Sequence, residues 1–345
     1  MTILALETSC DDTCAAVIED DGAIRSNVIS SQRAHDRFGG VVPEIASRHH
    51  LELVNVVVDQ ALADAHATLD DIQTVAATQG PGLVGALLVG LSTAKALAAA
   101  RELPFAAVDH LQGHIAANFL VSHIGAEPFD PPFLCLIASG GHTLLAHVSD
   151  NESFHALGRT LDDAAGEAFD KGARMLGLGY PGGPALERLA ASGSPDAFQF
   201  PSSGSRGRGG RGATRAFARS LDFSFAGVKT SLLYQLRELT EAQQQERAAD
   251  LAASYQAAIV DHLILRAEQA LELTGLDRLA VGGGVAANGE LRRRLATLGA
   301  TQHVPPTVLC TDNAAMIGSA ARFLPHLAYP HYLGLDAYAT GERLR

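Results

Sequence analysis

Two histidines stand four residues apart in the segment DHLQGH (109–114), and this spacing can present two imidazoles to one metal ion. The segment follows a short apolar strand at 105–108, and we expect a helix over residues 110–121. Side chains at positions i and i+4 share one helical face, so His110 and His114 can reach one point. The glutamate of HExxH is missing. Alone, the spacing fits a chance match or a buried polar pair better than a metal site.

A third ligand would turn this pair into a site, and Asp312 is the candidate. It lies in CTDN (310–313), just before an apolar run at 314–323 that we expect to be helical. A second interpretation stays open, because an aspartate here can simply cap the helix N-terminus. Two histidines and one carboxylate leave coordination positions vacant, which is typical of a catalytic rather than a structural metal.

Glycine-rich turns in the second half suggest a nucleotide site. SGGH (139–142) lies between two strand-like runs, and GGGVAAN (282–288) lies between a buried strand and a helical segment at 289–298. Backbone N–H groups in such turns can bind phosphate oxygens, although glycine also serves ordinary turns. GPGLVG (80–85) formally matches GxGxxG, but Glu102 precedes the next strand instead of ending it. We interpret this segment as a close-packed turn before a helix.

Acidic residues and a stiff loop mark residues 162–187. Asp163, Glu167 and Asp170 fall on one face of an expected helix, which fits a solvated face held by ion pairs. YPGGP (180–184) then ends the helix. A stiff loop beside acidic groups could also shape a ligand site.

These groups depend on a strand–turn–strand plan that occurs twice. Residues 2–7 and 13–18 are strand-like around a polar turn, and 133–138 and 143–148 repeat the plan about half a chain later. We therefore expect an α/β fold of two duplicated lobes that face an interlobe cleft. The helical segments and buried strands that alternate with the hairpins include 44–64, 84–100, 73–78 and 278–282.

The composition is that of an ordinary globular enzyme, with 47% hydrophobic and 19% charged residues among 345. A net charge of −12 argues against a general nucleic-acid binder. Residues 202–220 are the exception, because they carry five arginines and no acidic residue; they are either a solvated insertion or an RNA-backbone contact. The four cysteines form no CxxC pair, and neither a signal peptide nor an apolar span is evident. We expect a cytoplasmic protein.

A series of longer motifs runs almost from end to end of the chain: LETSCDDT (6–13), GGVVPEIASRHHLE (39–52), GPGLVGALLVGLSTAKALA (80–98), DHLQGHIAANF (109–119), ASGGHT (138–143), LDDAAGEAFDKGARMLGLGYPGGP (161–184), FSFAGVKT (223–230), GGGVAAN (282–288) and CTDNAAMI (310–317). In these motifs the chain resembles the tRNA adenosine threonylcarbamoyltransferases. This family belongs to the actin/Hsp70/sugar-kinase structural superfamily and was once described as O-sialoglycoprotein endopeptidases. So many ordered motifs make the resemblance specific.

The resemblance implies site residues position by position. His110, His114 and Asp312 match the ligands of one divalent metal ion per subunit, iron(II) or zinc. Glu7 and Asp11 lie in a hairpin equivalent to the phosphate-binding hairpin of the superfamily, and they are the candidates for catalysis. The positions that match nucleotide or acyl-adenylate contacts are Ile137, Ala138, Ser139, Gly140, Gly141, Asp170, Gly183, Glu187 and Asn288.

The implied reaction transfers threonylcarbamoyl from threonylcarbamoyl-adenylate to N6 of adenosine 37, in tRNAs that read codons beginning with A. The implied partners are tRNA, a paralogous non-catalytic subunit and a small ATPase, with no membrane. The helix at 84–100 is either a dimerisation surface or ordinary core packing. Three alternatives are a small-molecule kinase of the same superfamily, a metalloprotease and a non-catalytic scaffold.

We expect a first lobe at residues 1–109 with about 325–345, a metal-ligand helix and connection at 110–130, and a second lobe at 131–324. The sequence departs from the family pattern in two places. The insertion at 202–220 is longer and more basic than the family leads us to expect, and Asp109 fills a variable position to which no role is transferred.

Overall fold

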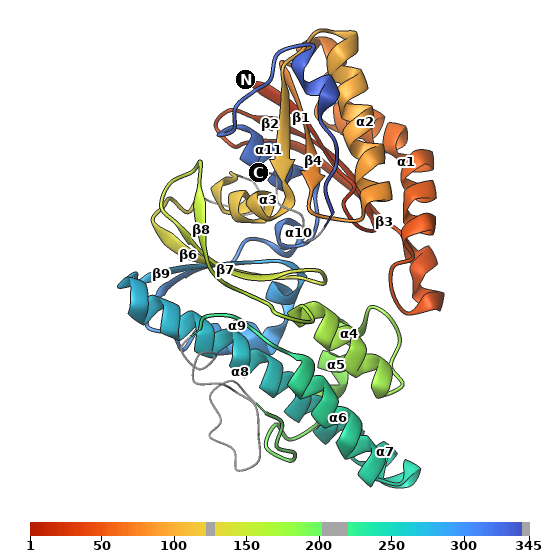
Figure 1. Cartoon of the computed structure of the whole chain (residues 1–345), viewed down its shortest axis with the longest axis vertical. Coiled ribbons are helices and arrows are strands. Elements are labelled where there is room, and N and C mark those ends of the chain that lie inside the picture. Colours follow the sequence, from red (N-terminus) through yellow and green to blue (C-terminus); the bar gives the residue numbers. More distant parts are fainter. Residues whose placement is uncertain (122–127, 202–219, 340–345) are drawn as a thin grey trace. The chain divides into compact units, whose positions relative to one another are not determined.

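The computed structural model describes residues 1–121, 128–201 and 220–339 (Figure 1). It divides into two compact units. The first comprises Met1–Pro131, Asp150–Ser153 and Pro305–Arg345, and the second comprises Pro132–Ser149 and Phe154–Val304. The arginine- and glycine-rich stretch at 202–220 lies outside the described residues except for Ser220, so its two interpretations stay open.

A mixed five-stranded sheet forms the centre of the first unit. Its strands are β1 (Thr2–Glu7), β2 (Asp12–Glu19), β3 (Ile24–Ser31), β4 (Thr74–Gly80) and β5 (Phe105–Asp109). Their order is β3-β2-β1-β4-β5. β1 and β2 pair antiparallel, as do β2 and β3, while β4 and β5 run parallel to β1. β1 and β4 are almost fully buried, which is typical of central strands covered on both faces.

Helices cover both faces of this sheet (Figure 1). They are α1 (Pro43–Asp64), α2 (Val84–Ala100), α3 (His110–Ala116) and α11 (Ala314–Ala321), and the short helix α10 (Thr307–Cys310) precedes α11 along the chain. α1 and α2 pack on one face, where Leu4 and Leu6 of β1 join the same buried core as Val57 of α1. α11 packs on the other face. A Cβ atom at Gly318 would lie only 2.7 Å from Ile18, so glycine allows this close approach.

Residues 305–324 belong to the first unit, whereas the sequence led us to expect them in the second lobe (131–324). The physical reason is that α11 packs on β1, β2 and α3. The Ser319 hydroxyl donates a 2.7 Å hydrogen bond to the carbonyl of Ala116 and ties α11 to the end of α3. Asp312, just before α11, therefore shares a unit with the two histidines.

The helix expected over residues 110–121 is shorter than predicted. α3 ends at Ala116, and a 3-10 turn (Ala117–Phe119) follows. The Asn118 side-chain amide donates a 2.8 Å hydrogen bond to the carbonyl of Ile115 and closes this turn. The shorter helix still contains both histidines.

The second unit repeats the sheet of the first. Its strands are β6 (Phe133–Ala138), β7 (Thr143–Val148), β8 (Phe154–Arg159), β9 (Arg278–Gly282) and β10 (Thr301–His303). The order is β10-β9-β6-β7-β8, with β6 antiparallel to β7 and parallel to β9. This is the order and direction of β5-β4-β1-β2-β3, so the expected duplicated α/β fold is confirmed.

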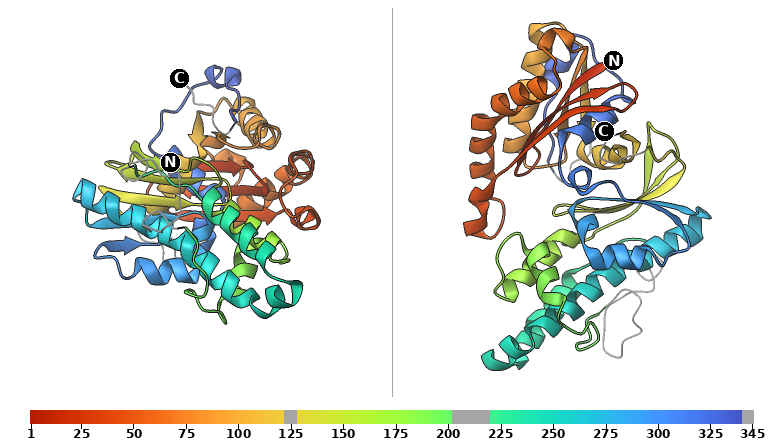
Figure 2. Two further views of the ribbon diagram at one scale, coloured as in Figure 1. Left: turned by 60° about the horizontal axis from the view of Figure 1, so that its bottom comes forward. Right: turned by 180° about the vertical axis from the view of Figure 1, so that it is seen from behind.

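The helices of the second unit pack around one long helix, which Figure 2 shows from behind. They are α4 (Ala165–Met175), α5 (Gly182–Ala190), α6 (Ala226–Glu238), α7 (Glu241–Glu246), α8 (Ala248–Thr274) and α9 (Gly289–Leu295). Tyr255 of α8 is fully buried and donates a 2.8 Å hydrogen bond to the carbonyl of Ala168 in α4. Gly275 ends α8 in the left-handed conformation, with φ 70°. Among the described residues, none of the helices has the length and apolar character needed to span a membrane.

Candidate metal centre

α3 begins at a capped N-terminus that fixes the two histidines. The Asp109 carboxylate accepts hydrogen bonds from the backbone N–H groups of Leu111 (2.8 Å) and Gln112 (3.1 Å). The Tyr338 hydroxyl donates to the same carboxylate at 2.6 Å. Asp109, to which the sequence assigned no role, thus sets where α3 starts, one residue before the first histidine.

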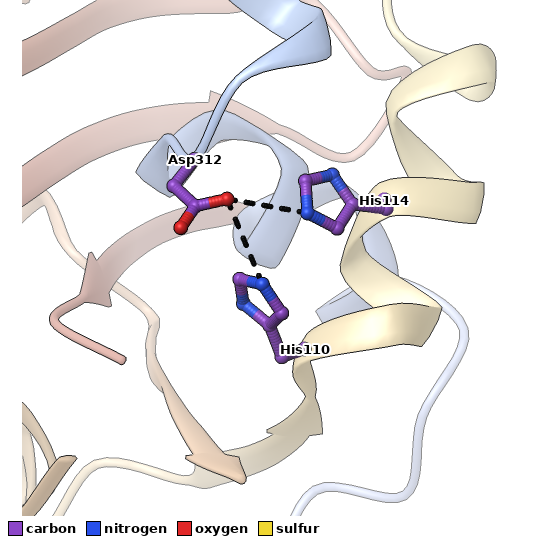
Figure 3. Close-up of side chains that lie close together, drawn as sticks. All are labelled: His110, His114 and Asp312. Atoms are coloured by element: carbon purple, nitrogen blue, oxygen red, sulfur yellow. Dashed lines mark ion pairs between the residues drawn. The ribbon is translucent and has the colours of Figure 1, made fainter. Parts of the chain in front are cut away.

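Three potential ligand side chains meet in the first unit (Figure 3). His110 Nε2 lies 3.6 Å from Asp312 Oδ1, and His114 Nε2 lies 3.2 Å from the same oxygen. The ligand atoms of the three residues all lie within 4.8 Å of one another. Both imidazoles are almost completely buried, while the aspartate side chain is about one fifth exposed, at 22%. The group therefore has two histidines from one helix and a carboxylate from a distant segment.

Asp312 does not cap α11, which was one of its two possible roles. The cap is Asn313, whose side-chain oxygen accepts a 3.0 Å hydrogen bond from the backbone N–H of Met316. Asn313 also donates from its amide nitrogen to the carbonyl of Thr311, at 2.7 Å. The neighbouring residue thus performs the capping, and the carboxylate of Asp312 points toward the two imidazoles (Figure 3).

The donor set fits a small divalent ion. A tetrahedral ion with bonds of about 2.1 Å holds its ligand atoms roughly 3.4 Å apart. The separations of 3.6 and 3.2 Å lie on either side of that value. Neither ring nitrogen of His114 has a hydrogen-bond partner among the described residues, although both are buried. His114 Nε2 faces the Asp312 carboxylate at 3.2 Å without a hydrogen bond, and a metal ion between the two would satisfy both.

Glu7, at the end of β1, contacts His110 at Nδ1, while the other ring nitrogen of His110 faces Asp312. Its Oε2 lies 3.0 Å from His110 Nδ1 and accepts a 2.6 Å hydrogen bond from the Thr78 hydroxyl. Burial opposes ionisation of Glu7, but the charge and hydrogen bond of His110 outweigh it and hold its pKa below the usual value. Burial also disfavours the imidazolium, yet the carboxylates of Asp312 and Glu7 raise the pKa of His110 to about 9.

The other candidate of the first hairpin, Asp11, is not one of the three grouped ligands. It lies in the turn between β1 and β2 and is partly exposed. Burial, together with the charge of Asp312, raises its pKa above the usual value. The next residue, Asp12, responds more strongly, because burial raises its pKa to about 7. The turn between β1 and β2 is therefore acidic, and burial together with the charge of Asp312 disfavours ionisation of Asp11 and Asp12.

In the second unit, the SGGH turn (139–142) closes on itself after β6. The Ser139 backbone N–H donates to the His142 carbonyl at 2.8 Å, and the His142 N–H donates to the Ser139 hydroxyl at 3.0 Å. Ile137 and Ala138 are fully buried in β6. Gly140 and Gly141 are exposed, and an added Cβ at either would meet no atom within 4 Å. The Cβ side of both glycines is therefore open, while the start of α4 contacts the turn through a 3.0 Å hydrogen bond from the Gly166 N–H to the Ser139 carbonyl.

The carboxylates expected to contact substrate hold backbone groups of their own unit. Asp170 Oδ1 accepts hydrogen bonds from the N–H groups of Gly182 (2.8 Å) and Gly183 (3.3 Å), at the start of α5. Glu187 of α5 accepts a 2.8 Å hydrogen bond from the N–H of Gly289. These two side chains therefore link α4 to α5 and α5 to α9.

Asn288 and Gly283 hold the second glycine-rich turn. Asn288 caps α9 through its side-chain oxygen, which accepts from the N–H of Leu291 at 3.0 Å, and it donates to Gln256 at 2.9 Å. Gly283 has φ 85°, and an added Cβ would lie 2.3 Å from the carbonyl oxygen of Ala138. This turn packs tightly, unlike the open turn after β6.

Two contacts escaped the sequence analysis. Thr78, which holds Glu7, could have been found, since β4 runs parallel to β1 and the ends of parallel neighbours meet at one edge. Asp163 precedes α4 and pairs with Lys171 and Lys229, so it supports the ion-pair interpretation of this acidic segment. Lys229 lies in α6, and no local spacing connects it to Asp163.

The fold and the site define an α/β protein of two duplicated units, whose first unit carries a His–His–Asp group able to hold a metal ion. The family model described as tRNA N6-adenosine threonylcarbamoyltransferase matches residues 23–319, and the chain belongs to this family. Proteins of that name from Clostridium kluyveri and Clostridium novyi are 48% and 46% identical over 328 and 326 residues. The alignments cover 94% and 93% of this chain and 92% of each relative.

Solved structures with low sequence identity share the fold. HypF of T. kodakarensis matches with a TM-score of 0.59 at 14% identity, over 92% of this chain and 47% of that protein. Component A of (R)-2-hydroxyglutaryl-CoA dehydratase from Acidaminococcus fermentans matches with a TM-score of 0.53 at 16% identity, over 96% of this chain and 99% of that one. These likenesses support the two-lobed α/β architecture.

Proposed function

We propose that this protein transfers the threonylcarbamoyl group of threonylcarbamoyl-adenylate to N6 of adenosine 37, in tRNAs that read codons beginning with A. The family to which the chain belongs supports the reaction class. The observation that carries the proposal is the convergence of His110, His114 and Asp312 on one point. This group is what an acyltransferase of this kind would use to hold a catalytic ion.

The chemistry requires placement more than activation. The adenosine amine attacks the carbamoyl carbon of the mixed anhydride, the bond from that carbon to the phosphate oxygen breaks, AMP leaves, and the amine gives up a proton. Because AMP is a good leaving group, holding the two reactants together and stabilising the developing charge provide most of the acceleration.

His110, His114 and Asp312 would hold one divalent ion, with iron(II) or zinc as the candidates. When bound, such an ion supplies Lewis-acid polarisation and a fixed point for the anionic adenylate. Two imidazoles and one carboxylate leave coordination positions vacant on such an ion, which phosphate or carboxylate oxygens of the substrate could take. Burial of both imidazoles keeps water away from the ligand nitrogens.

The substrate contacts proposed in the second unit use backbone groups first. Gly140 and Gly141 leave room for a ligand on their Cβ side, where a phosphate or the adenosine could lie against the turn and accept a hydrogen bond from the backbone. Asp170, Glu187 and Asn288 would shape this site by holding the start of α5 and α9. Ile137, Ala138, Ser139 and Gly183 would support it through the main chain.

Partner proteins are a further part of the proposal: a paralogous non-catalytic subunit and a small ATPase, in the cytoplasm. A chain with a net charge of −12 needs positive charge from elsewhere to bind tRNA well. α2 buries Leu87 and Leu91 in the core and leaves Val84 and Leu88 each 40% exposed. The core-packing interpretation therefore holds for one face of α2, and the exposed residues are where we propose a partner to bind.

A transfer assay tests the proposal. Labelled threonine, tRNA with an unmodified adenosine 37, the adenylate-forming system and the partner subunits are mixed with the metal-loaded protein. We expect label on that adenosine, loss of labelling after chelation, and its return when the metal is added back. Folded, metal-loaded protein that gives no label beside active partners would sink the transferase proposal.

A further inference from the structure

The Glu7 carboxylate is held from three directions in the interior of the first unit. Its Oε1 accepts a short hydrogen bond from the backbone N–H of Ser9. Its Oε2 accepts from the Thr78 hydroxyl at 2.6 Å and faces His110 Nδ1 at 3.0 Å. Glu7 is only 1% exposed, so it has no direct path to a substrate. Its contacts come from the first hairpin, β4 and α3, which fix the carboxylate relative to the metal-ligand helix.

Two groups face His110 Nδ1: the Glu7 carboxylate at 3.0 Å and the Ser9 hydroxyl at 3.2 Å. The carboxylate is the nearer of the two, and it determines which nitrogen of His110 is available to a metal. An ionised carboxylate can only accept hydrogen bonds, so Nδ1 must carry the proton in the contact with Glu7. The lone pair of the neutral ring then belongs to Nε2, the nitrogen 3.6 Å from Asp312 Oδ1. A hydrogen bond of this kind also makes the imidazole more basic and fixes the plane of the ring.

The second histidine lacks such a support. His114 is 1% exposed, and its Nδ1 has no hydrogen-bond partner among the described residues. Its ring packs edge-on against that of His110, with centroids 4.7 Å apart. The orientation of His114 therefore depends on packing in α3 and on its neighbour, which makes His110 the better fixed of the two.

We propose that Glu7 is a positioning residue of the metal centre, which orients His110 with Nε2 toward the ion and does not itself touch substrate. This inference rests on the metal site of the proposed function. Carboxylates that hold a metal-bound histidine contribute about 10- to 100-fold to metal affinity. Thr78 and the Ser9 N–H keep the carboxylate in place and complete the arrangement.

The test measures metal affinity directly. The full chain is freed of metal with a chelator and titrated with Co²⁺ against a competing chromophoric chelator. We expect Glu7→Gln, which keeps the size and removes the charge, to raise the Co²⁺ Kd by about 10- to 100-fold. The visible band of bound Co²⁺ should also shift, because the imidazole becomes a weaker donor. A purely structural role for Glu7 would not move that band.

The matched control is Glu19→Gln, which makes the same chemical change at the end of β2 in the same unit. The Glu19 carboxylate accepts hydrogen bonds from the Thr2 hydroxyl (3.1 Å) and from Arg25 (3.2 Å), and neither contact involves the metal-ligand group. We expect Glu19→Gln to bind Co²⁺ within about threefold of the unchanged protein, because a partly exposed ion pair contributes little.

The possible outcomes distinguish the positioning role of Glu7 from the metal site on which that role depends. If the unchanged protein does not bind Co²⁺ stoichiometrically, the metal centre itself is wrong. If it binds, and Glu7→Gln binds equally well with an unchanged band, the positioning role is overturned and the metal site stands. Should Glu7→Gln fail to fold, Thr78→Val takes its place, since it removes one hydrogen bond to the carboxylate. We then expect a severalfold weaker Kd, and an unchanged one would overturn the role.

Discussion

The predicted site residues of the two units differ in what they offer to a ligand. In the first unit, three side chains from two distant segments converge within 4.8 Å. In the second unit, the oxygens of Asp170, Glu187 and Asn288 hold backbone N–H groups of α5 and α9. In the first unit, side chains already converge on one point, which is what a metal ion needs. In the second unit, side chains fix the backbone and the glycine turn after β6 keeps open space, which a larger, flat nucleotide can use.

Two buried histidines show how strongly neighbouring groups determine the pKa of an imidazole. His110 faces two carboxylates, which raise its pKa to about 9 despite burial. His262 of α8, in the second unit, is equally buried, but it faces the carbonyl of Pro201 and lies near Arg266. Burial lowers its pKa to about 4. Only the first environment favours a positive charge, as a metal-binding site must.

The largest expected effect comes from removing the distant ligand. Asp312→Ala leaves two histidines without a carboxylate, so we expect metal content to fall below about a tenth and transfer activity to fall by more than about 100-fold. Elemental analysis and the transfer assay measure the two together. Asp11→Asn, which changes an acidic residue outside the ligand group, should keep its metal. Full activity and metal content in Asp312→Ala would refute the site.

The next effect falls on the second unit, at its tight turn. Gly283→Ala places a Cβ 2.3 Å from the carbonyl oxygen of Ala138 and demands φ 85° from alanine. We expect a loss of about 3 kcal/mol in the free energy of unfolding, measured with urea. Gly275→Ala is the control, because Gly275 has φ 70° and open space around its Cβ position. It should cost about 1 kcal/mol. Equal losses would mean that strain in φ, and not the close contact, dominates.

The third effect sharpens the contrast between the histidines. Because the folded pKa of His262 is lowered to about 4, its contribution to stability is complete above about pH 6.5 and is lost as the pH falls toward and through 4. We expect His262→Phe, which keeps a ring beside Phe225, to reduce the loss of unfolding free energy between pH 7 and 5 by about 2 kcal/mol. Urea titrations at both pH values measure this difference. The exposed His155, changed to Gln, should leave the pH dependence as it is; a similar change there would remove the special role of His262.

Sequence alone located several buried strands and the helix α2, but it identified neither the edge strands β3 and β8 nor the long buried helix α8. β1, β6, β7, β9 and α2 have the predicted bounds, because apolar runs between polar or glycine residues identify them. β3 and β8 were missed, since both are edge strands with only one buried position each. A half-buried edge strand carries too little hydrophobic pattern to be recognised.

The site was predictable where residues are close in sequence. The spacing of His110 and His114 is local and predicts their shared face. Asp312 was a candidate ligand with helix capping as its alternative, and only the resemblance matched it to a ligand position, because no periodicity links it to α3. The contact of Glu7 with His110 depends on how β1 ends beside α3, and no spacing reveals it. Asn313, not Asp312, caps α11, and two adjacent residues with similar capping ability cannot be told apart by sequence.

The smallest expected effect is the most specific for the open turn. Gly140→Ala adds a Cβ that meets no atom within 4 Å, so the free energy of unfolding should stay within about 0.5 kcal/mol. A ligand on the open side of this turn would meet that methyl group, and we expect the KM for threonylcarbamoyl-adenylate to rise about 10-fold. The Co²⁺ Kd should not change, because the metal ligands lie in the other unit. A variant with unchanged KM would show that the open space is not used by the substrate, and the contrast between the two units would then rest on the metal centre alone.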